Sequence, residues 1–246
     1  MHGSVIMDGL MFPRNPEPND LRLLVFDWDG TLMDSIGSIV ACTRAMMDEL
    51  GLGGVPDQTI RGTIGLGLRE TVEILCPGGG EALFAAVLDT YRKHWLATWR
   101  DQPVLFAGVR ETLAELADEG YLLAVATGKS RRGLDHVLAQ TGLDCAFHAT
   151  RTVDEALSKP HPEMLLAILD ELGVRPGAAV MIGDTTYDLE MARNAGTGAI
   201  GVCTGSHGRE ELLRLEPLAC LAAVAELPGW LAGLREPAEM CSPLLR

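Results

Sequence analysis

Residues 21–35 read LRLLVFDWDGTLMDS, an apolar run that changes abruptly into a polar segment at Asp27. A short apolar run of this kind, followed by turn-forming residues, is typical of a strand buried on both faces of a parallel sheet. The run therefore places Asp27 at the carboxyl end of a first strand. By itself an Asp-Gly pair after a strand indicates only a turn, so the assignment of the fold depends on whether further apolar runs end in polar residues.

The pattern repeats along the chain. Three more apolar runs follow, at 121–126 (YLLAVA), 178–182 (AAVMI) and 199–203 (AIGVC). Amphipathic segments with helical spacing separate them. Strand and helix thus alternate, which predicts an α/β fold: a Rossmann-like, doubly wound parallel sheet with helices on both faces.

Polar residues follow the ends of these runs. Asp27 follows the first run, Thr127 follows the second, and Gly183 and Asp184 follow the third. In open parallel sheets, ligands bind beyond the carboxyl ends of the strands. We therefore expect these separated segments to meet at one site.

The alternation is interrupted between the first two runs. Residues 36–104 show helical patterns around a Gly-rich stretch, and we interpret them as an α-helical cap inserted into the α/β core of residues 21–35 and 105–235. The two ends, 1–20 and 236–246, lack apolar periodicity and are predicted to be loose tails.

Composition limits the possible partners. The formal charge of -14, from 20 basic and 34 acidic residues, disfavours non-specific nucleic-acid binding. The six cysteines form no CxxC pair, which favours buried thiols over disulfides or zinc ligands. No apolar run approaches the roughly 18–20 residues that span a bilayer, so no membrane partner is expected. The N-terminus shows no secretory signal pattern, and we predict a cytoplasmic protein.

The polar segment from Asp27 to Ser35 carries a family resemblance. It reads DWDGTLMDS and resembles the DxDGTLxDS signature of the haloacid dehalogenase superfamily. Residues 125–129 (VATGK), 158–163 (SKPHPE) and 183–188 (GDTTYD) resemble the other three motifs of that superfamily. A chance turn does not account for so long a match.

The resemblance implies phosphoryl transfer through a covalent intermediate. In the superfamily, a residue matching Asp27 is the nucleophile that forms an aspartyl-phosphate. A residue matching Asp29 protonates the leaving oxygen and then activates water. Dehalogenases of the superfamily carry a different residue at the position of Asp29, which favours a phosphatase here.

The other motifs imply phosphate contacts. Thr127 and the backbone N–H of Gly128 would hold the phosphoryl oxygens, with a helix N-terminus behind them. The ammonium of Lys159 would offset the charge of phosphate and carboxylates. Lys129, in contrast, is expected to be a solvated side chain.

The resemblance also implies a magnesium cofactor. Mg²⁺ prefers oxygen ligands in near-octahedral geometry. The carboxylates of Asp27 and Asp184 and the backbone carbonyl of Asp29 would supply them. We expect Asp188 on the same helix face as Asp184, acting from outside the ligand set through water or by pairing with Lys159.

The cap is predicted to choose the substrate. Residues 61–70 (RGTIGLGLRE) resemble the substrate-facing loop in caps of phosphoglycolate phosphatases. Arg69 could bind a substrate carboxylate, although an exposed helical arginine is the alternative. Trp95 and Trp99, at helical spacing, are interpreted as a packing face.

The resulting prediction is a Mg²⁺-dependent phosphatase that hydrolyses a small phosphorylated metabolite, such as a phosphoglycolate-like phosphomonoester. A phosphomutase of the same superfamily would keep the same core motifs and stays an alternative. A non-catalytic, metabolite-sensing module is a second alternative, although all four motif carboxylates are present. The expected partner is a small phosphoester, and the sequence leaves the oligomeric state open.

Overall fold

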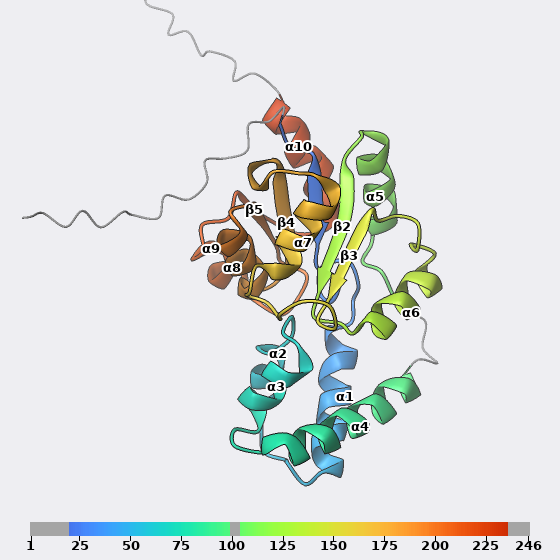
Figure 1. Cartoon of the computed structure of the whole chain (residues 1–246), viewed down its shortest axis with the longest axis vertical. Helices are drawn as coiled ribbons and strands as arrows, with labels where there is room; N and C mark the ends of the chain where they lie inside the picture. Colours follow the sequence, from blue (N-terminus) through green and yellow to red (C-terminus); the bar gives the residue numbers. More distant parts are fainter. Residues whose placement is uncertain (1–19, 99–103, 236–246) are drawn as a thin grey trace, which may run out of the picture.

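A six-stranded parallel sheet forms the centre of the computed structural model, which describes residues 20–98 and 104–235 (Figure 1). The strands lie in the order β3-β2-β1-β4-β5-β6. The predicted tails at 1–20 and 236–246, Asp20 apart, and the chain at 99–103 lie outside the described residues. The strands are β1 (Leu23–Phe26), β2 (Leu122–Thr127), β3 (Ala149–Thr152), β4 (Ala179–Gly183), β5 (Gly198–Val202) and β6 (Ala219–Leu221).

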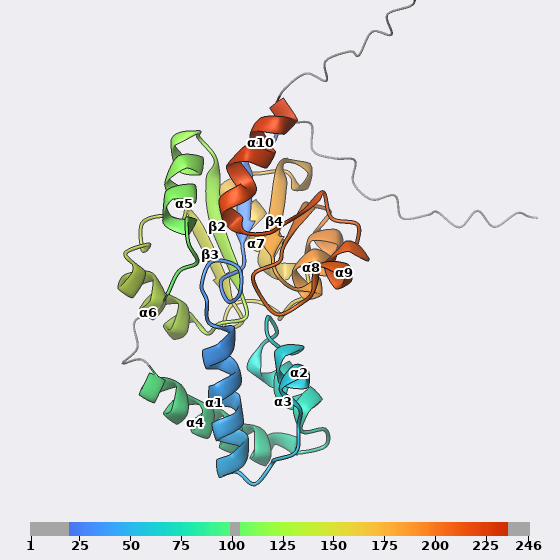
Figure 2. The same cartoon turned by 180° about the vertical axis from the view of Figure 1, so that it is seen from behind.

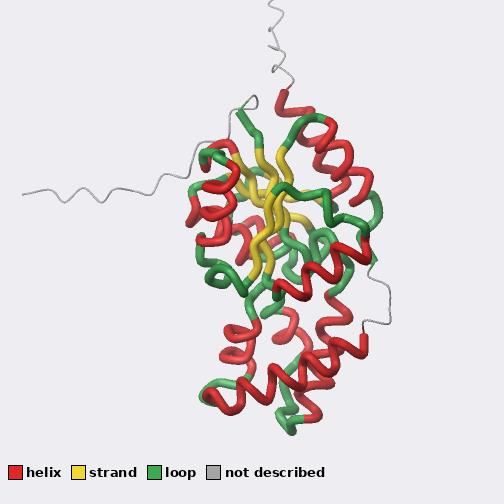
Figure 3. The backbone as a smooth tube through the Cα atoms, turned by 45° about the vertical axis from the view of Figure 1, so that its right-hand side comes forward, coloured by secondary structure: helices red, strands yellow, loops and turns green. Residues whose placement is uncertain are grey.

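Helices cover both faces of this sheet. Successive side chains of each buried strand point to opposite faces, so both faces are apolar and both are covered. Leu24 and Phe26 join one apolar cluster, and Leu23 and Val25 join the other. The first cluster includes residues of α5, α6 and α10, and the second includes residues of α7 and α8. The predicted doubly wound α/β fold is confirmed (Figure 3). The helices are α5 (Val109–Asp118), α6 (Arg131–Thr141), α7 (Glu163–Leu172), α8 (Thr186–Ala195), α9 (Arg209–Leu213) and α10 (Leu227–Arg235).

Two strands differ from the sequence-based expectation. β3 has the sequence ATRT and contains no apolar run, whereas β6 (ACL) lies inside the apolar residues 218–225, for which we predicted no strand. Both lie at the edges of the sheet, where one side of the strand has no partner and burial is incomplete. A search for apolar runs therefore finds the four central strands and misses β3, which is polar.

Four helices between β1 and α5 form a separate apolar cluster beyond the carboxyl end of the sheet (Figures 1 and 2). We refer to residues 36–98 as the cap; the limits of core and cap as domains stay a prediction. Within the described residues no single helix is long and apolar enough to cross a membrane. The pair α3 and α4 meets that criterion only together, across a bend of 116°. The cap helices are α1 (Ile36–Glu49), α2 (Asp57–Arg61), α3 (Leu68–Leu75) and α4 (Gly80–Thr98).

Candidate active site

The carboxyl ends of β1 and β4 bring two aspartates together. The two strands pair in parallel, and the backbone N–H of Asp27 donates to the carbonyl of Ile182 at 2.9 Å. Asp27 follows β1 directly, and Asp184 follows β4 directly. In the sheet, β1 lies between β2 on one side and β4 on the other, and the strand order reverses between β1 and β4. Asp27 and Asp184 therefore flank this point. Ligands of doubly wound sheets bind at this point.

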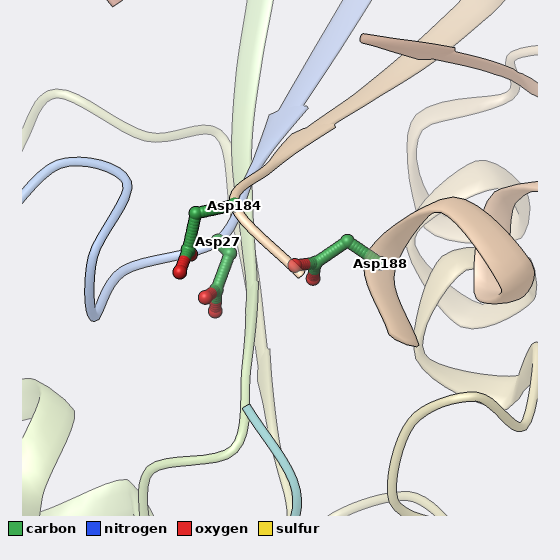
Figure 4. A group of neighbouring side chains, drawn as sticks. All are labelled: Asp27, Asp184 and Asp188. Carbon is green, nitrogen blue, oxygen red and sulfur yellow. The ribbon is translucent and has the colours of Figure 1, made fainter. Parts of the chain in front are cut away.

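Three buried carboxylates and one ammonium form the centre of the site. Each of Asp27, Asp184 and Asp188 has an oxygen within 4.8 Å of the others, and Figure 4 shows Asp188 reaching from α8 toward the other two. Lys159 Nζ lies 2.7 Å from Asp27 Oδ1 and 2.6 Å from Asp188 Oδ1. Asp27 Oδ2, also buried, accepts no hydrogen bond from the described residues.

The close packing of these buried charged groups shifts their pKa values. Burial, reinforced by the charge of Asp188 and opposed by Lys159, raises the pKa of Asp27 from 3.8 to about 7. Burial and the charges of Asp27 and Asp188 likewise raise the pKa of Asp184 well above its usual value. Burial alone would lower the pKa of Lys159, but the two carboxylates outweigh it and raise the pKa. The raised pKa values follow from placing three carboxyl groups beside a single ammonium away from water.

Asp188 is held by the first turn of α8. Thr185 caps this helix: its hydroxyl accepts from the N–H of Asp188, and the Asp188 carboxylate accepts from the N–H and hydroxyl of Thr185. Asp184 precedes the helix, so the expectation that Asp184 and Asp188 share one helix face is wrong. The predicted pairing of Asp188 with Lys159 is present in the structure at 2.6 Å.

Asp184 is fixed by groups that the sequence analysis did not single out. Its Oδ1 accepts from the hydroxyl of Thr31 at 2.9 Å, and its Oδ2 accepts from the N–H of Ser206 at 2.8 Å. A Cβ at Gly205 would lie 1.8 Å from Asp184 Oδ2, so only glycine leaves room for this carboxylate. The signal that could have found Gly205 and Ser206 is their place in a polar, Gly-rich loop directly after the fourth apolar run.

Asp29 is held at the edge of the cluster by two side chains. The hydroxyl of Ser35 donates to Asp29 Oδ1 at 2.5 Å, and Lys129 Nζ lies 2.9 Å from the same oxygen. Only 7% of the Lys129 side chain is exposed, and Nζ lies 5.0 Å from the centre of the Trp95 ring in the cap. The expectation that Lys129 is solvated is therefore wrong, because its ammonium lies between a core carboxylate and a cap aromatic ring.

Thr127 and Gly128 lie where β2 ends and the chain turns toward α6. Thr127 is the last residue of β2 and is buried, and its Oγ1 accepts from the N–H of Lys129 at 3.2 Å. Ser130 caps α6 by accepting from Gly133 N–H. A Cβ at Gly128 would lie 2.7 Å from the carbonyl oxygen of Leu66, so the cap loop approaches this backbone closely.

A cavity of about 610 Å³ opens between the cap and these strand ends. Asp27, Asp29, Thr127 and Gly128 line it on the core side. Arg69 lines it from the cap, but its guanidinium pairs with Glu81 at 2.7 Å and is half exposed. The described cap contacts the core directly: the hydroxyl of Tyr187 donates to the carbonyl of Gly62 at 2.7 Å, and the N–H of Gly67 donates to Ser158 Oγ at 2.8 Å.

The sequence model of the haloacid dehalogenase-like hydrolase family matches residues 24–202, which is most of the chain and includes Asp27, Lys159, Asp184 and Asp188. The chain belongs to this family.

Individual proteins and a solved structure are also similar to this chain, in agreement with the family assignment. The chain is 37% identical to the protein described as "Probable phosphatase IndB" of Dickeya dadantii, over 84% of this chain and 92% of that protein. It is 30% identical to the phosphoglycolate phosphatase of Psychrobacter arcticus, over 80% and 90%. The structure of a haloacid dehalogenase-like hydrolase from Bacteroides fragilis superposes with a TM-score of 0.79 at 28% identity, over 84% and 99%.

The structure of this haloacid dehalogenase-like hydrolase brings most of the predicted site residues into one place. Asp27, Lys159 and Asp188 are in direct contact, with Asp184 beside them. The remaining core residues, Asp29, Thr127 and Gly128, line the adjoining cavity with Asp27. Arg69 lies in the cap wall of that cavity, paired with Glu81, and its role as a carboxylate ligand stays a prediction.

Proposed function

We propose that this hydrolase is a magnesium-dependent phosphatase that cleaves a phosphomonoester through an aspartyl-phosphate on Asp27. The observation that carries the proposal is the buried Asp27 carboxylate, whose Oδ2 accepts no hydrogen bond from the described residues at the floor of a cavity. A buried carboxylate oxygen without a donor is costly unless a ligand contacts it. The phosphatases named among the relatives support the same reaction.

The donor set fits a magnesium ion. Three carboxylates with oxygens within 4.8 Å of one another face a single ammonium, so a divalent cation would compensate the excess charge. Asp27 and Asp184 would hold the ion with the backbone carbonyl of Asp29. Asp188 would stay outside the ligand set, because its oxygens already accept from Lys159 and Thr185. Such an ion, when bound, neutralises phosphate charge and orients the phosphoryl group.

The chain's own residues would perform the first half of the reaction. A carboxylate oxygen of Asp27 attacks phosphorus, and the bond from phosphorus to the alcohol oxygen breaks. Asp29 gives its proton to that oxygen, so the alcohol leaves neutral. Lys159, 2.7 Å from Asp27, holds the nucleophile and offsets charge that builds on the phosphoryl oxygens.

The second half regenerates the enzyme. Asp29 takes a proton from water, the water oxygen attacks phosphorus, and the bond from Asp27 to phosphorus breaks to release phosphate. Ser35 and Lys129 keep the Asp29 carboxylate at the cavity through both halves. Thr127 and Gly128 would hold the phosphoryl oxygens, because both line the cavity beside Asp27.

The test is phosphate release from a panel of small phosphomonoesters with and without Mg²⁺. Asp27→Asn preserves size but supplies a poor nucleophile, so we expect turnover to fall by about 10³-fold or more. Asp34→Asn is the matched control, because Asp34 belongs to the same segment and is exposed. Wild-type turnover in Asp27→Asn would refute the mechanism. Isomer formation from a hexose 1-phosphate without phosphate release would indicate a phosphomutase, and binding without turnover would indicate a sensing module.

A further inference from the structure

One wall of the cavity beneath the cap is aromatic. Tyr91 and Trp95, both in α4, stack with ring centres 6.0 Å apart and planes inclined by 10°. Both rings line the cavity, as does Phe84 of the same helix. Trp95 packs against Tyr91, as expected for a packing face, and Trp99 lies outside the described residues. The stacked pair also lines the space where a substrate would bind.

The cavity is larger than a two-carbon phosphoester requires. Its volume of about 610 Å³ lies in the range of sites that enclose drug-sized ligands, which are mostly apolar with a few placed polar groups. Asp27, Asp29 and Thr127 line it from the core, and the hydroxyl-bearing residues Thr43, Thr63 and Thr71 line it from the cap. The cap side adds aliphatic side chains such as Ile60 and Leu88 to its aromatic wall.

The cations nearest this wall already have anionic partners. Lys129 pairs with Asp29 at 2.9 Å, and Arg69 pairs with Glu81 at 2.7 Å. A substrate carboxylate placed here would have to compete with these pairs. Arg92 and Arg132 also line the cavity, and both are exposed and therefore reach solvent.

The proposed reaction sets the direction in which the substrate extends. The oxygen that Asp29 protonates belongs to the alcohol, so the alcohol part of the ester begins beside Asp29. Lys129 Nζ lies 2.9 Å from Asp29 Oδ1 and 5.0 Å from the Trp95 ring centre, so the aromatic wall begins one side chain away. A flat apolar group attached near the ester oxygen would reach Trp95.

We propose that the substrate of this site is a phosphomonoester whose alcohol carries an uncharged, flat, aromatic group that packs along Tyr91 and Trp95. This inference rests on the proposed phosphatase function. It differs from the phosphoglycolate-like substrate suggested by the cap loop, because it requires apolar contact with α4 in place of a carboxylate contact. Burial of an aromatic group against such a wall favours binding through the hydrophobic effect and ring stacking.

The first experiment compares three alkyl phosphates on the full-length protein with Mg²⁺. We expect kcat/KM for 2-phenylethyl phosphate to exceed that for ethyl phosphate by about tenfold or more, since both release primary alcohols and differ in the ring. Phosphoglycolate should resemble ethyl phosphate. Equal values for 2-phenylethyl and ethyl phosphate, or a preference for phosphoglycolate, would overturn the inference.

The second experiment tests the wall itself. Trp95→Ala should lower the ratio of kcat/KM for 2-phenylethyl phosphate over ethyl phosphate by about tenfold, mainly through KM, while Trp95→Phe should preserve most of it. Lys93→Ala is the control on the same helix, because Lys93 is exposed and pairs with Glu49. An unchanged ratio in Trp95→Ala would overturn the inference even if the ester preference holds.

Acetyl phosphate separates the two proposals, because it is small, activated and not aromatic. Hydrolysis of acetyl phosphate that depends on Asp27, without an aromatic preference, rejects the substrate inference and keeps the phosphatase. No hydrolysis of any of the four compounds by folded protein rejects the phosphatase and, with it, the inference that rests on it.

Discussion

Lys159 Nζ lies 2.7 Å from Asp27 Oδ1, and neither side chain is more than 1% exposed. An ion pair removed from water loses the hydration of both charges, and it persists only where partners satisfy both groups. Lys159 meets this condition with a second carboxylate, Asp188, at 2.6 Å. The ammonium is thus held between the proposed nucleophile and the first turn of α8, which fixes its position before substrate arrives.

Replacing Lys159 with methionine should therefore impair both catalysis and folding. Lys159→Met keeps the length of the side chain but leaves the carboxylates without a counter-charge, so kcat should fall by about 10²–10³-fold. The free energy of unfolding should fall by about 3–5 kcal/mol, as for other broken buried pairs. Steady-state kinetics and urea unfolding measure the two effects. Lys93→Met, which removes an exposed ion pair, should change neither appreciably, and an unchanged kcat in Lys159→Met would contradict the proposed role.

Asp29→Asn should slow the release of poor leaving groups. The amide cannot donate a proton as a carboxylic acid does, so the rate with an alkyl phosphate should fall by about 10²–10⁴-fold. The value of kcat/KM for acetyl phosphate, which reports only the steps up to formation of the aspartyl-phosphate, should fall much less, because its leaving group needs no proton. Comparison of the two substrates in Asp29→Asn and in the exposed control Asp34→Asn measures this. Equal losses with both substrates would argue for a structural role of Asp29.

Magnesium should stabilise the protein more at high pH than at low pH. Burial raises the pKa of Asp27 to about 7, above its unfolded value of 3.8, so the metal-free native state binds more protons than the unfolded state between these values. Stability from this group is fully present below pH 3.8 and is lost as pH rises through 7. Mg²⁺ binds the deprotonated form and should restore the loss.

The measurement is the rise in Tm on adding Mg²⁺ to chelator-treated protein, from pH 5.5 to pH 8. We expect the rise to grow with pH in the wild type and to grow less in Asp27→Asn, which removes one of the titrating carboxylates. Asp184, whose pKa is also raised, would retain part of the trend. A rise that is constant across this range would contradict the assignment of these carboxylates as ligands.

The sequence predicted which residues meet at the carboxyl end of the sheet, because that information is local. A buried parallel strand must be apolar throughout, so a polar residue at its end is visible without a structure. Asp27, Thr127 and Asp184 were found in this way, and the residues at 158–163 entered through the family resemblance. β3 was not predicted, because its sequence ATRT gives no apolar run to detect. β6 was not predicted, because its three residues belong to an apolar stretch that continues beyond the strand.

The environment of each carboxylate could not be predicted from local patterns. Lys129 resembles any exposed lysine after a strand, and its burial depends on Trp95, which comes from a different helix of the cap. Ser206 contacts Asp184 only because β5 lies next to β4. Arg69 pairs with Glu81 of the neighbouring helix, a contact that the residues around Arg69 in the sequence do not indicate. Predicting contacts between segments that are distant in sequence requires knowledge of the strand order and of the helix packing.

Gly128 lies so close to the cap loop that the loop leaves no room for a side chain. A Cβ at this position would lie 2.7 Å from the Leu66 carbonyl and 2.8 Å from the Gly65 carbonyl, and both are backbone atoms that cannot rotate away. Gly128→Ala should therefore push the cap loop off the strand ends. Misplacing groups by about 1 Å can cost about 10²-fold, so we expect kcat/KM to fall by about tenfold to hundredfold with unchanged stability of the core.

The matched control is Gly37→Ala in α1, because a Cβ there meets no atom within 4 Å and alanine favours a helix. Gly37→Ala should keep the wild-type kcat/KM, so that a loss confined to Gly128→Ala reports the cap contact. Hydrogen exchange of backbone amides at 62–67 should increase in Gly128→Ala, since the N–H of Gly67 would lose its bond to Ser158. Unchanged exchange together with wild-type kinetics would show that the loop adjusts to the methyl group, and that the close approach of the cap to Gly128 is not needed for turnover.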